Sequence, residues 1–201
     1  MVTSAAAAVD TRTRPPTEGN FFVGREPYPT YVEYLIPTTS THKTPIILIH
    51  GGEHTGAGYV STPDGRDGWA KYFVGHGWTT YVVDWPEHGR SPMPEEFPTM
   101  SLRRIVDDNV ELLRRVGRAV ILVHSLSGAP GWKLCETVPN EVAAIVGIAP
   151  HRQPTYRADM RQSYGVDLLI SLAETISPRT SHSGIHAMPR GRLLPMRLCF
   201  R

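Results

Sequence analysis

Four short runs of apolar and β-branched residues in the middle of the chain constrain its fold more than any other feature of the sequence. They occupy residues 45–50, 79–84, 119–123 and 143–148. Their nearly continuous apolar character is typical of strands that are buried on both faces. Helical patterns separate the runs, and strands that alternate with helices predict right-handed crossovers and an open, mostly parallel sheet with flanking helices. The predicted fold class is therefore α/β.

The flanking segments complete this prediction. Helical spacing of apolar residues and a serine N-cap predict the helices, while aromatic and β-branched residues predict a strand pair near the N-terminus. The predicted helices lie at 67–76, at 102–116 after Ser101, and in a short stretch that ends at Thr137; the predicted strand pair lies at 20–24 and 31–36. Residues 166–173 fit a helix or a strand, and no structure is predicted for residues 178–201.

Length, composition and charge set the expected organisation. A chain of 201 residues with 40% hydrophobic content fits one core, so we expect a single domain at residues 20–176. A disordered leader is expected at 1–19. A basic, irregular tail is expected at 177–201, since five arginines and no acid follow Glu174. The net charge of +2 is too small to predict a nucleic-acid partner.

The cysteines and the hydropathy pattern set the expected environment. Cys135 and Cys199 lie far apart and predict neither a disulfide framework nor a zinc site, so a reducing, cytoplasmic location is expected. No stretch of about 18 consecutive apolar residues occurs, so no transmembrane helix is predicted. The N-terminus also lacks the basic region of a secretory signal. We therefore expect a soluble protein without a membrane partner.

The strongest indication of chemistry is the step from the third run into residues 124–128, with the sequence HSLSG. A tight turn from a strand into a helix exposes a serine hydroxyl above the carboxyl edge of the sheet. Ser125 is therefore the candidate nucleophile. The segment departs from the G-x-S-x-G pattern, since Val123 and Ser127 replace the two outer glycines. The alternative is a helix N-terminus at which Ser125 or Ser127 only caps free amides.

A glycine pair, Gly51 and Gly52, directly follows the first run. Acyl transfer requires N–H donors aimed at the developing oxyanion, and a glycine loop here, with the amide after the nucleophile, can supply two. Gly52 and Leu126 are the candidate donors of this oxyanion hole. Taken alone, a Gly-Gly turn after a strand has a purely structural explanation. Asp84, at the end of the second run, is interpreted as a scaffold residue that hydrogen-bonds loop amides.

Taken in order, these segments resemble the α/β-hydrolases, and among them esterases of the bacterial esterase 713 type. The resemblance covers about residues 20–170 and rests on the stretches at 21–24, 31–37, 45–52, 55–56, 62–66, 68–69, 81–84, 89–91, 124–128 and 131–132. It implies an α/β-hydrolase fold and a nucleophile at Ser125 rather than Ser127. The implied activity is hydrolysis of a small-molecule carboxylic ester or lactone. Such chemistry needs no cofactor, and no metal-ligand cluster is present in the sequence.

The resemblance also implies a catalytic acid after the strand that follows the nucleophile, and a histidine after the last strand. Ala149 stands at the position of the acid. The last strands of the fold are expected to be missing, so that the domain is partial and truncated at its C-terminus. The candidate bases are His182, His186 and His151, and the orienting acids considered are Asp159, Asp167 and Glu174. The alternative for these histidines is an exposed basic segment without a catalytic role.

The sequence leaves two functional hypotheses open. The first is a serine hydrolase that acts on an ester. The second is a catalytically impaired α/β-hydrolase-like protein with a binding role or none, which is favoured by Ala149 and by the expected loss of the last strands. A parallel sheet that ends early would leave an apolar edge and face uncovered. A homodimer that covers this surface is therefore also considered.

Overall fold

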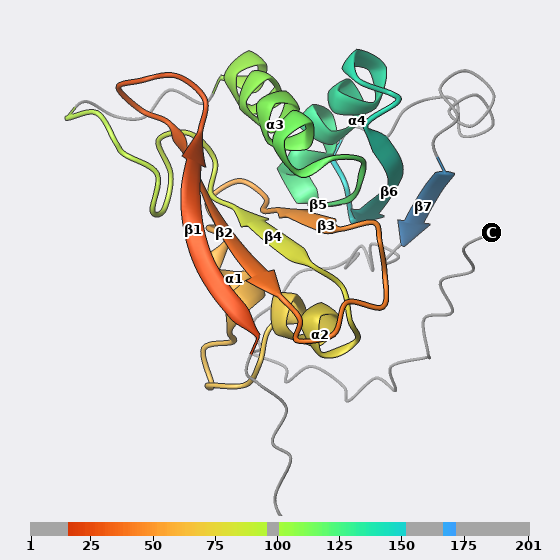
Figure 1. Cartoon of the computed structure of the whole chain (residues 1–201). Helices are drawn as coiled ribbons and strands as arrows, with labels where there is room; N and C mark the ends of the chain where they lie inside the picture. The colour runs from red at the N-terminus through yellow and green to blue at the C-terminus, as the bar shows by residue number, and fades with distance from the viewer. Residues whose placement is uncertain (1–15, 96–100, 152–166, 172–201) are drawn as a thin grey trace, which may run out of the picture.

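The computed structural model describes residues 16–95, 101–151 and 167–171, and within them a seven-stranded sheet forms the centre of the molecule (Figure 1). The strand order is β1-β2-β4-β3-β5-β6-β7. The strands are β1 (Thr17–Val23), β2 (Thr30–Ile36), β3 (Ile46–Ile49), β4 (Thr80–Val83), β5 (Ala119–His124), β6 (Val142–Ile148) and β7 (Asp167–Ser171). In this spatial order, all neighbouring strands from β4 through β3, β5 and β6 to β7 pair parallel. The β1–β2 and β2–β4 pairs are antiparallel. The predicted open, mostly parallel sheet is confirmed.

Helices flank the sheet on both sides. They are α1 (Ala57–Val60), α2 (Trp69–Gly75), α3 (Leu102–Val116) and α4 (Gly128–Thr137), with a 3-10 turn at Ser125–Ser127. In Figure 1, α3 and α4 lie on one side of the sheet, and α1 and α2 lie on the other. The helices predicted at 67–76 and 102–116 are confirmed. Ser101 is the N-cap of α3, where its hydroxyl accepts the Arg104 N–H at 3.4 Å.

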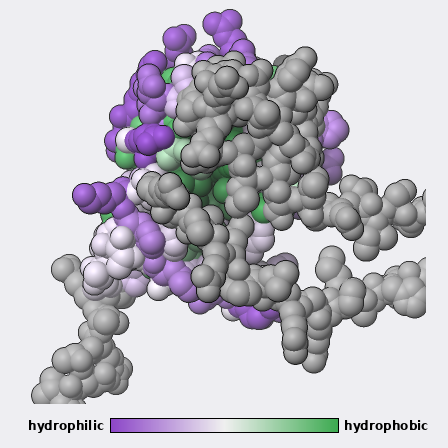
Figure 2. Space-filling model, turned by 90° about the vertical axis from the view of Figure 1, so that its right-hand side faces the viewer, coloured by the Kyte–Doolittle hydropathy of each residue, from purple (hydrophilic) through white to green (hydrophobic). Residues whose placement is uncertain are grey.

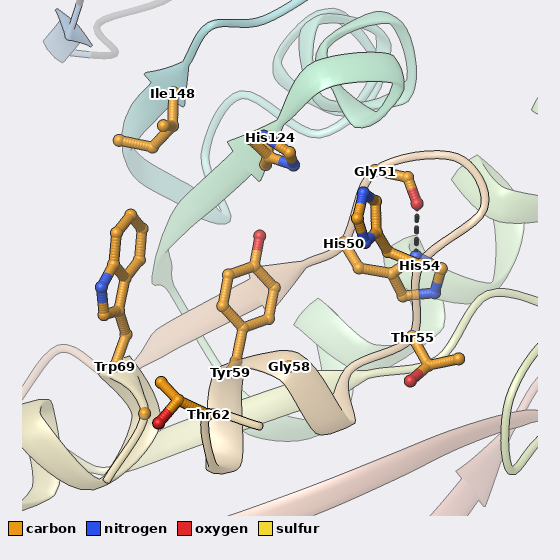
Figure 3. A pocket seen from close by; sticks show the side chains of 11 residues that line it. His50, Gly51, His54, Thr55, Gly58, Tyr59, Thr62, Trp69, His124 and Ile148 are labelled. Carbon is orange, nitrogen blue, oxygen red and sulfur yellow. Dashed lines mark hydrogen bonds between the residues drawn. The ribbon is translucent and has the colours of Figure 1, made fainter. Parts of the chain in front are cut away.

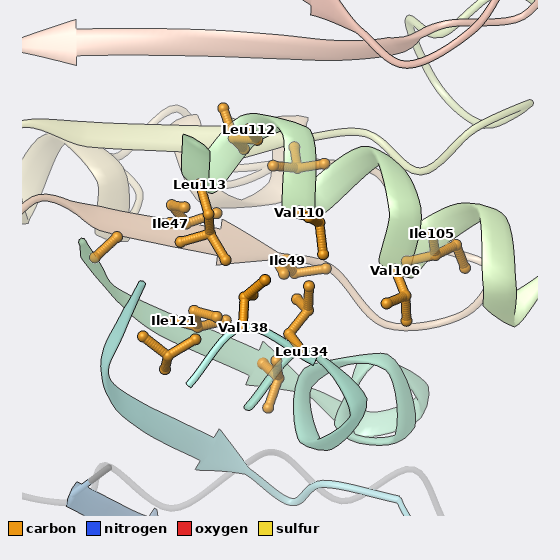
Figure 4. Packing of buried hydrophobic residues seen from close by; sticks show 14 of the residues in the cluster. Ile47, Ile49, Ile105, Val106, Val110, Leu112, Leu113, Ile121, Leu134 and Val138 are labelled. Carbon is orange, nitrogen blue, oxygen red and sulfur yellow. The ribbon is translucent and has the colours of Figure 1, made fainter. Parts of the chain in front are cut away.

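Alternating side chains build an apolar core on each face of the sheet, and Figure 4 shows the core on the side of α3 and α4. In β3, Ile47 and Ile49 pack in the core that α3 and α4 cover, while Ile46 and Leu48 pack in the core on the α2 side. All four are at most 4% exposed. Each such aliphatic side chain stabilises the fold by about 1.5–3 kcal/mol when it is fully buried. Burial on both faces explains why this run contains no polar residue.

The two ends of the sheet refine the sequence predictions. β1 pairs with β2 from Thr17↔Ile36 to Val23↔Thr30, so the strand already begins at Thr17, although the predicted leader extended to residue 19. Within the undecided segment at 166–173, the described residues 167–171 form a strand, β7, that pairs parallel with β6. Residues 1–15 of the predicted leader and the predicted tail at 177–201 lie outside the described residues.

Polar and apolar residues are unevenly distributed over the described surface. Seen from the β7 side of the sheet, hydrophilic residues lie at the visible rim and hydrophobic residues show toward the middle (Figure 2). Among the helices of the described residues, none is both long and apolar enough to cross a membrane.

Candidate active site

The carboxyl edge of the parallel strands contains the strained backbone of the molecule. Four non-glycine residues of the described chain have φ in the left-handed region, and one follows each of β3, β4, β5 and β6. They are Glu53 (60°), Glu87 (62°), Ser125 (53°) and Ala149 (42°). Residues held in such conformations cluster at functional sites, because the surrounding structure must stabilise them. This edge is therefore the candidate active site.

Ser125 occupies the turn between β5 and α4. It is the first residue after β5, it begins the 3-10 turn, and its φ of 53° lifts it out of the strand direction. Its side chain is partly exposed, and within the described residues no hydrogen bond engages its hydroxyl. The sequence prediction of a tight strand-to-helix turn at Ser125 is confirmed. Its role as nucleophile remains a prediction at this point.

Ser127, two residues further, has the opposite environment. It is fully buried, and its hydroxyl accepts the His124 N–H at 2.7 Å. The same hydroxyl lies 2.9 Å from two carbonyl oxygens, those of Ile49 and His124, to which it can donate. Ser127 therefore ties the turn to the end of β3. Ser127 is the N-cap residue of α4, but its hydroxyl accepts the His124 N–H before the helix and caps no amide of α4 itself.

The Gly51–Gly52 loop lies directly against this turn. A Cβ atom at Gly51 would lie 3.0 Å from Ser125 Cβ and 2.9 Å from the His124 carbonyl oxygen. A Cβ atom at Gly52 would overlap Leu126 Cδ1. At Gly51 the close atom belongs to the backbone, so a side chain there would force the turn to shift, whereas at Gly52 it is the end of the flexible Leu126 side chain. The two residues whose amides were predicted as oxyanion donors, Gly52 and Leu126, lie on segments in contact.

His50 holds the loop in place. Its Nδ1 lies 2.6 Å from the Gly51 carbonyl oxygen, as the dashed line in Figure 3 shows. Its Nε2 accepts a hydrogen bond from the backbone N–H of Trp85 at 3.0 Å. Nε2 as acceptor leaves the proton on Nδ1, which donates to Gly51. Burial lowers the pKa of His50 to about 4, so the ring is neutral at pH 7. Because C=O and N–H point in opposite directions in a trans peptide, His50 also sets the direction of the Gly52 N–H.

In the loop after β4, hydrogen bonds engage both carboxylate oxygens of Asp84, which fits the scaffold role predicted for this residue. The buried carboxylate accepts the Gly56 N–H, and it accepts the Arg90 N–H and Nε–H at 2.8 Å each. Arg90 in turn contacts Glu33 at 2.5 Å. Every oxygen of the Asp84 carboxylate has a donor, so this acid has no free lone pair directed at a substrate.

The end of β6 brings one candidate base next to the turn at Ser125. The backbone N–H of His151 donates to the Ser125 carbonyl oxygen at 2.6 Å. His182 and His186 lie outside the described residues. Ala149 follows β6 directly, and its methyl group cannot orient an imidazole.

The proposed orienting acid Asp167 is misplaced for that role. It is the first residue of β7 and pairs with Ala144, whereas the carboxyl end of β7, at Ser171, lies beside Ile148. Asp167 therefore lies at the amino edge of the parallel strands, opposite the edge that carries Ser125. Asp159 and Glu174 fall outside the described residues.

A cavity of about 390 Å³ opens beside the turn that carries Ser125, with the preceding residue, His124, in its lining (Figure 3). It is lined by His50, Gly51, His54, Thr55, Gly58, Tyr59, Thr62, Gly68, Trp69, His124 and Ile148. His124 directly precedes Ser125, and its ring lies 5.8 Å from that of His54, centroid to centroid. Burial, and secondarily the nearby His54, lowers the pKa of His124. Within the described part of the chain, no three His, Cys, Asp or Glu side chains gather to hold a metal ion.

Comparisons with known proteins agree with this architecture. A family model for the alpha/beta hydrolase fold matches residues 44–175. A probable secreted lipase of a fungal species is 28% identical over 192 residues, in a match that covers 67% of this chain and 53% of the lipase. The chain thus spans about half the length of this relative. Since the relative's name calls it secreted, the cytoplasmic location expected for this chain stays a prediction.

Solved structures share the fold. A bacterial esterase aligns with a TM-score of 0.67 at 23% identity, over 84% of this chain and 77% of the esterase. A CIB-like hydrolase from Thermoplasma acidophilum aligns with a TM-score of 0.60 at 18% identity, over 77% and 73% of the two chains. An epoxide hydrolase from Vigna radiata aligns with a TM-score of 0.52 at 20% identity, over 75% and 47%.

Proposed function

The chain belongs to the α/β-hydrolase fold family, and from this premise we propose that it is a serine hydrolase that cleaves a carboxylic ester or lactone. The observation that carries the proposal is Ser125, held at positive φ at the carboxyl end of a central strand against the Gly51–Gly52 loop. The relatives named lipase and esterase support the ester as substrate. A small-molecule ester is therefore the proposed partner.

The proposed reaction uses the turn at Ser125 and the Gly51–Gly52 loop together. Ser125 Oγ attacks the acyl carbon while a histidine takes its proton, and the Gly52 and Leu126 amides stabilise the oxyanion. The intermediate collapses to an acyl-serine as the same histidine protonates the leaving alcohol. Water, deprotonated by that histidine, then releases the acid and restores Ser125. His50 does not serve as this base, because both of its ring nitrogens are engaged and its pKa is about 4.

We propose the base among His151, His182 and His186. His151 has a specific observation in its favour, since its backbone amide is fixed 2.6 Å from the Ser125 carbonyl oxygen. Single alanine variants of the three histidines identify the base by the rate of covalent labelling at Ser125. Loss of the general base slows this rate by several orders of magnitude, whereas loss of either other histidine leaves it near the wild-type rate.

The nucleophile is tested by intact-mass detection of labelling with a fluorophosphonate probe. We expect one label on the wild-type chain, mapped to Ser125 by peptide mass, and none on Ser125→Ala. The matched control is Ser40→Ala, because Ser40 is an exposed serine whose hydroxyl donates only to the nearby His42 carbonyl oxygen. Undiminished labelling of Ser125→Ala, or an unlabelled wild-type chain that circular dichroism shows to be folded, contradicts the proposal.

Ala149 favours a second candidate, a catalytically impaired protein of the same fold. The position directly after β6, where the resemblance implies the catalytic acid, carries a methyl group. Under this hypothesis a folded wild-type chain hydrolyses p-nitrophenyl acetate no faster than Ser125→Ala does. Robust turnover that depends on Ser125 rules it out.

A further inference from the structure

The cavity beside Ser125 has two chemically different ends. Figure 3 shows Trp69 and Ile148 on one side, and Gly51, His50 and His54 on the other. Tyr59 lies between these sides and points its hydroxyl toward the strand ends. A ligand whose apolar part lies at the Trp69 end therefore has its other end beside the glycine loop that contacts Ser125.

The wall of the cavity is anchored to the same strand end as the nucleophile turn. The Tyr59 hydroxyl donates to the Ile49 carbonyl oxygen at 3.3 Å, and Ser127 Oγ lies 2.9 Å from the same oxygen. Burial raises the pKa of Tyr59, so the phenol stays protonated and keeps this hydrogen bond. The Tyr59 ring is thus held in a fixed position relative to Ser125.

Trp69 is held beside Tyr59 by the backbone. Gly68 donates its N–H to the Val60 carbonyl oxygen at 3.0 Å, and a Cβ atom at Gly68 would overlap the Tyr59 carbonyl group. This close approach joins the start of α2 to the end of α1. The two rings lie 6.1 Å apart, with planes inclined by 32°. The Trp69 side chain nevertheless remains 45% exposed, so its indole face is accessible to a ligand.

The lining favours an uncharged ligand that contains a ring. Within the described residues it includes no Asp, Glu, Lys or Arg, so a charged group would lose its hydration without gaining an opposite charge. Flat aromatic walls pair preferentially with another aromatic ring. The volume of about 390 Å³ lies near the lower end of ligand pockets, which suits one ring and a short ester link better than a long acyl chain.

We propose that this pocket selects uncharged aryl esters by packing their ring against Trp69, Tyr59 and Ile148. The inference rests on the proposed function, because it names the substrate class of the same site. Trp69 and Ile148 are then specificity residues: they bind the part of the substrate that does not react.

The test measures binding without turnover. On the Ser125→Ala chain, calorimetric titration compares ethyl phenylacetate with ethyl octanoate, an open-chain ester of equal carbon number. We expect the aryl ester to bind about 3- to 10-fold more tightly. Adding Trp69→Ala removes this preference. Adding Tyr72→Ala instead leaves it unchanged, because Tyr72 is an aromatic residue of the same helix, 59% exposed and outside the cavity lining.

A second variant covers the case in which Trp69→Ala fails to fold. Ile148→Phe narrows the same end of the cavity as Trp69 but from strand β6, so the aryl ester should bind at least about 3-fold more weakly to it. Equal binding of the two esters to the Ser125→Ala chain overturns the inference, as does a preference that survives both substitutions. The titration measures binding without catalysis, so its result is independent of the proposed hydrolase function. If the wild-type chain does not react with fluorophosphonate but the Ser125→Ala chain still prefers the aryl ester, the pocket inference stands and the proposed hydrolase function fails.

Discussion

The loops that follow β4 and β5 lie at the same edge of the sheet but have opposite properties. After β4, the Asp84 carboxylate is fully buried and accepts donors from Gly56 and Arg90. After β5, Ser125 is partly exposed, has positive φ, and offers a hydroxyl that no described residue engages. A polar group whose hydrogen bonds are all made stabilises the fold and has no capacity for a substrate. A polar group on strained backbone whose hydrogen bonds are not made contributes little to stability and is available for chemistry.

The largest effect should come from Asp84. Replacing Asp84 by Ala leaves the Gly56 and Arg90 donors without their buried acceptor and is expected to lower the free energy of unfolding by about 3–5 kcal/mol. Urea denaturation of wild type and variant measures the difference. The matched control is Asp64→Ala, because Asp64 is an exposed acid whose ion pair with Arg66 at 2.8 Å is screened by solvent, so its loss should leave the urea midpoint nearly unchanged. A similar small loss for Asp84→Ala would contradict the comparison.

His50 links the two loops, and its titration gives the next effect. Its folded pKa of about 4 lies below the usual value of 6.5, so between these pH values the unfolded chain binds more protons than the folded one. Stability must therefore fall as the pH drops from about 6.5 to 4, by about 3 kcal/mol in total from this residue.

This contribution is isolated by comparing wild type with His50→Asn, which does not titrate there. Urea midpoints measured from pH 7 to pH 4 should fall more steeply in the wild-type chain. Parallel pH profiles for the two proteins would show that His50 is not held neutral by the fold.

Ser127 should have a smaller effect, although it belongs to the same turn as Ser125. Ser127→Ala removes the partner of the His124 N–H and one donor to the Ile49 carbonyl oxygen, for an expected loss of about 1–3 kcal/mol. Thermal denaturation measures it. The proposal of Ser125 as nucleophile requires that Ser127→Ala, once folded, still reacts with fluorophosphonate at Ser125. Loss of labelling in a folded Ser127→Ala chain with unchanged Ser125 geometry would reassign the nucleophile.

The smallest effect sharpens the comparison most. Glycine at position 125 relieves the φ of 53° and removes no hydrogen bond of the described structure, so Ser125→Gly is expected to raise the free energy of unfolding by up to about 1 kcal/mol. The same variant should lose all fluorophosphonate labelling. A clear loss of stability in Ser125→Gly would show that the serine side chain serves the scaffold, as Asp84 does.

Local sequence patterns predicted a large part of this molecule. The four buried strands, the helix capped by Ser101 and the turn at Ser125 follow from the periodicity of apolar residues and from the sterics of short turns. Both depend on neighbours within a few positions of the chain. The glycine pair after β3 has a purely structural explanation when taken alone, and its position after a central strand, together with Ser125, made it a candidate oxyanion loop.

Contacts between distant segments could not be predicted in this way. The role of His50 depends on the Trp85 amide, 35 positions away, and a histidine before a glycine pair was the sequence's sole indication of it. Asp167 was considered as an orienting acid, but the parallel pairing of β7 places it at the opposite edge of the sheet from Ser125.

The sequence by itself therefore determined which segments are strands, which turn exposes Ser125, and where a glycine loop follows a central strand. Only the tertiary structure decided that the His151 backbone lies against the turn at Ser125, that Ser127 rather than Ser125 ties this turn to β3, and that Trp69 and Ile148 line one cavity. The physical reason is that burial and turn geometry are imposed by adjacent residues. Which side chains meet across the edge of a sheet depends instead on strand order and direction, which the packing of the whole domain sets.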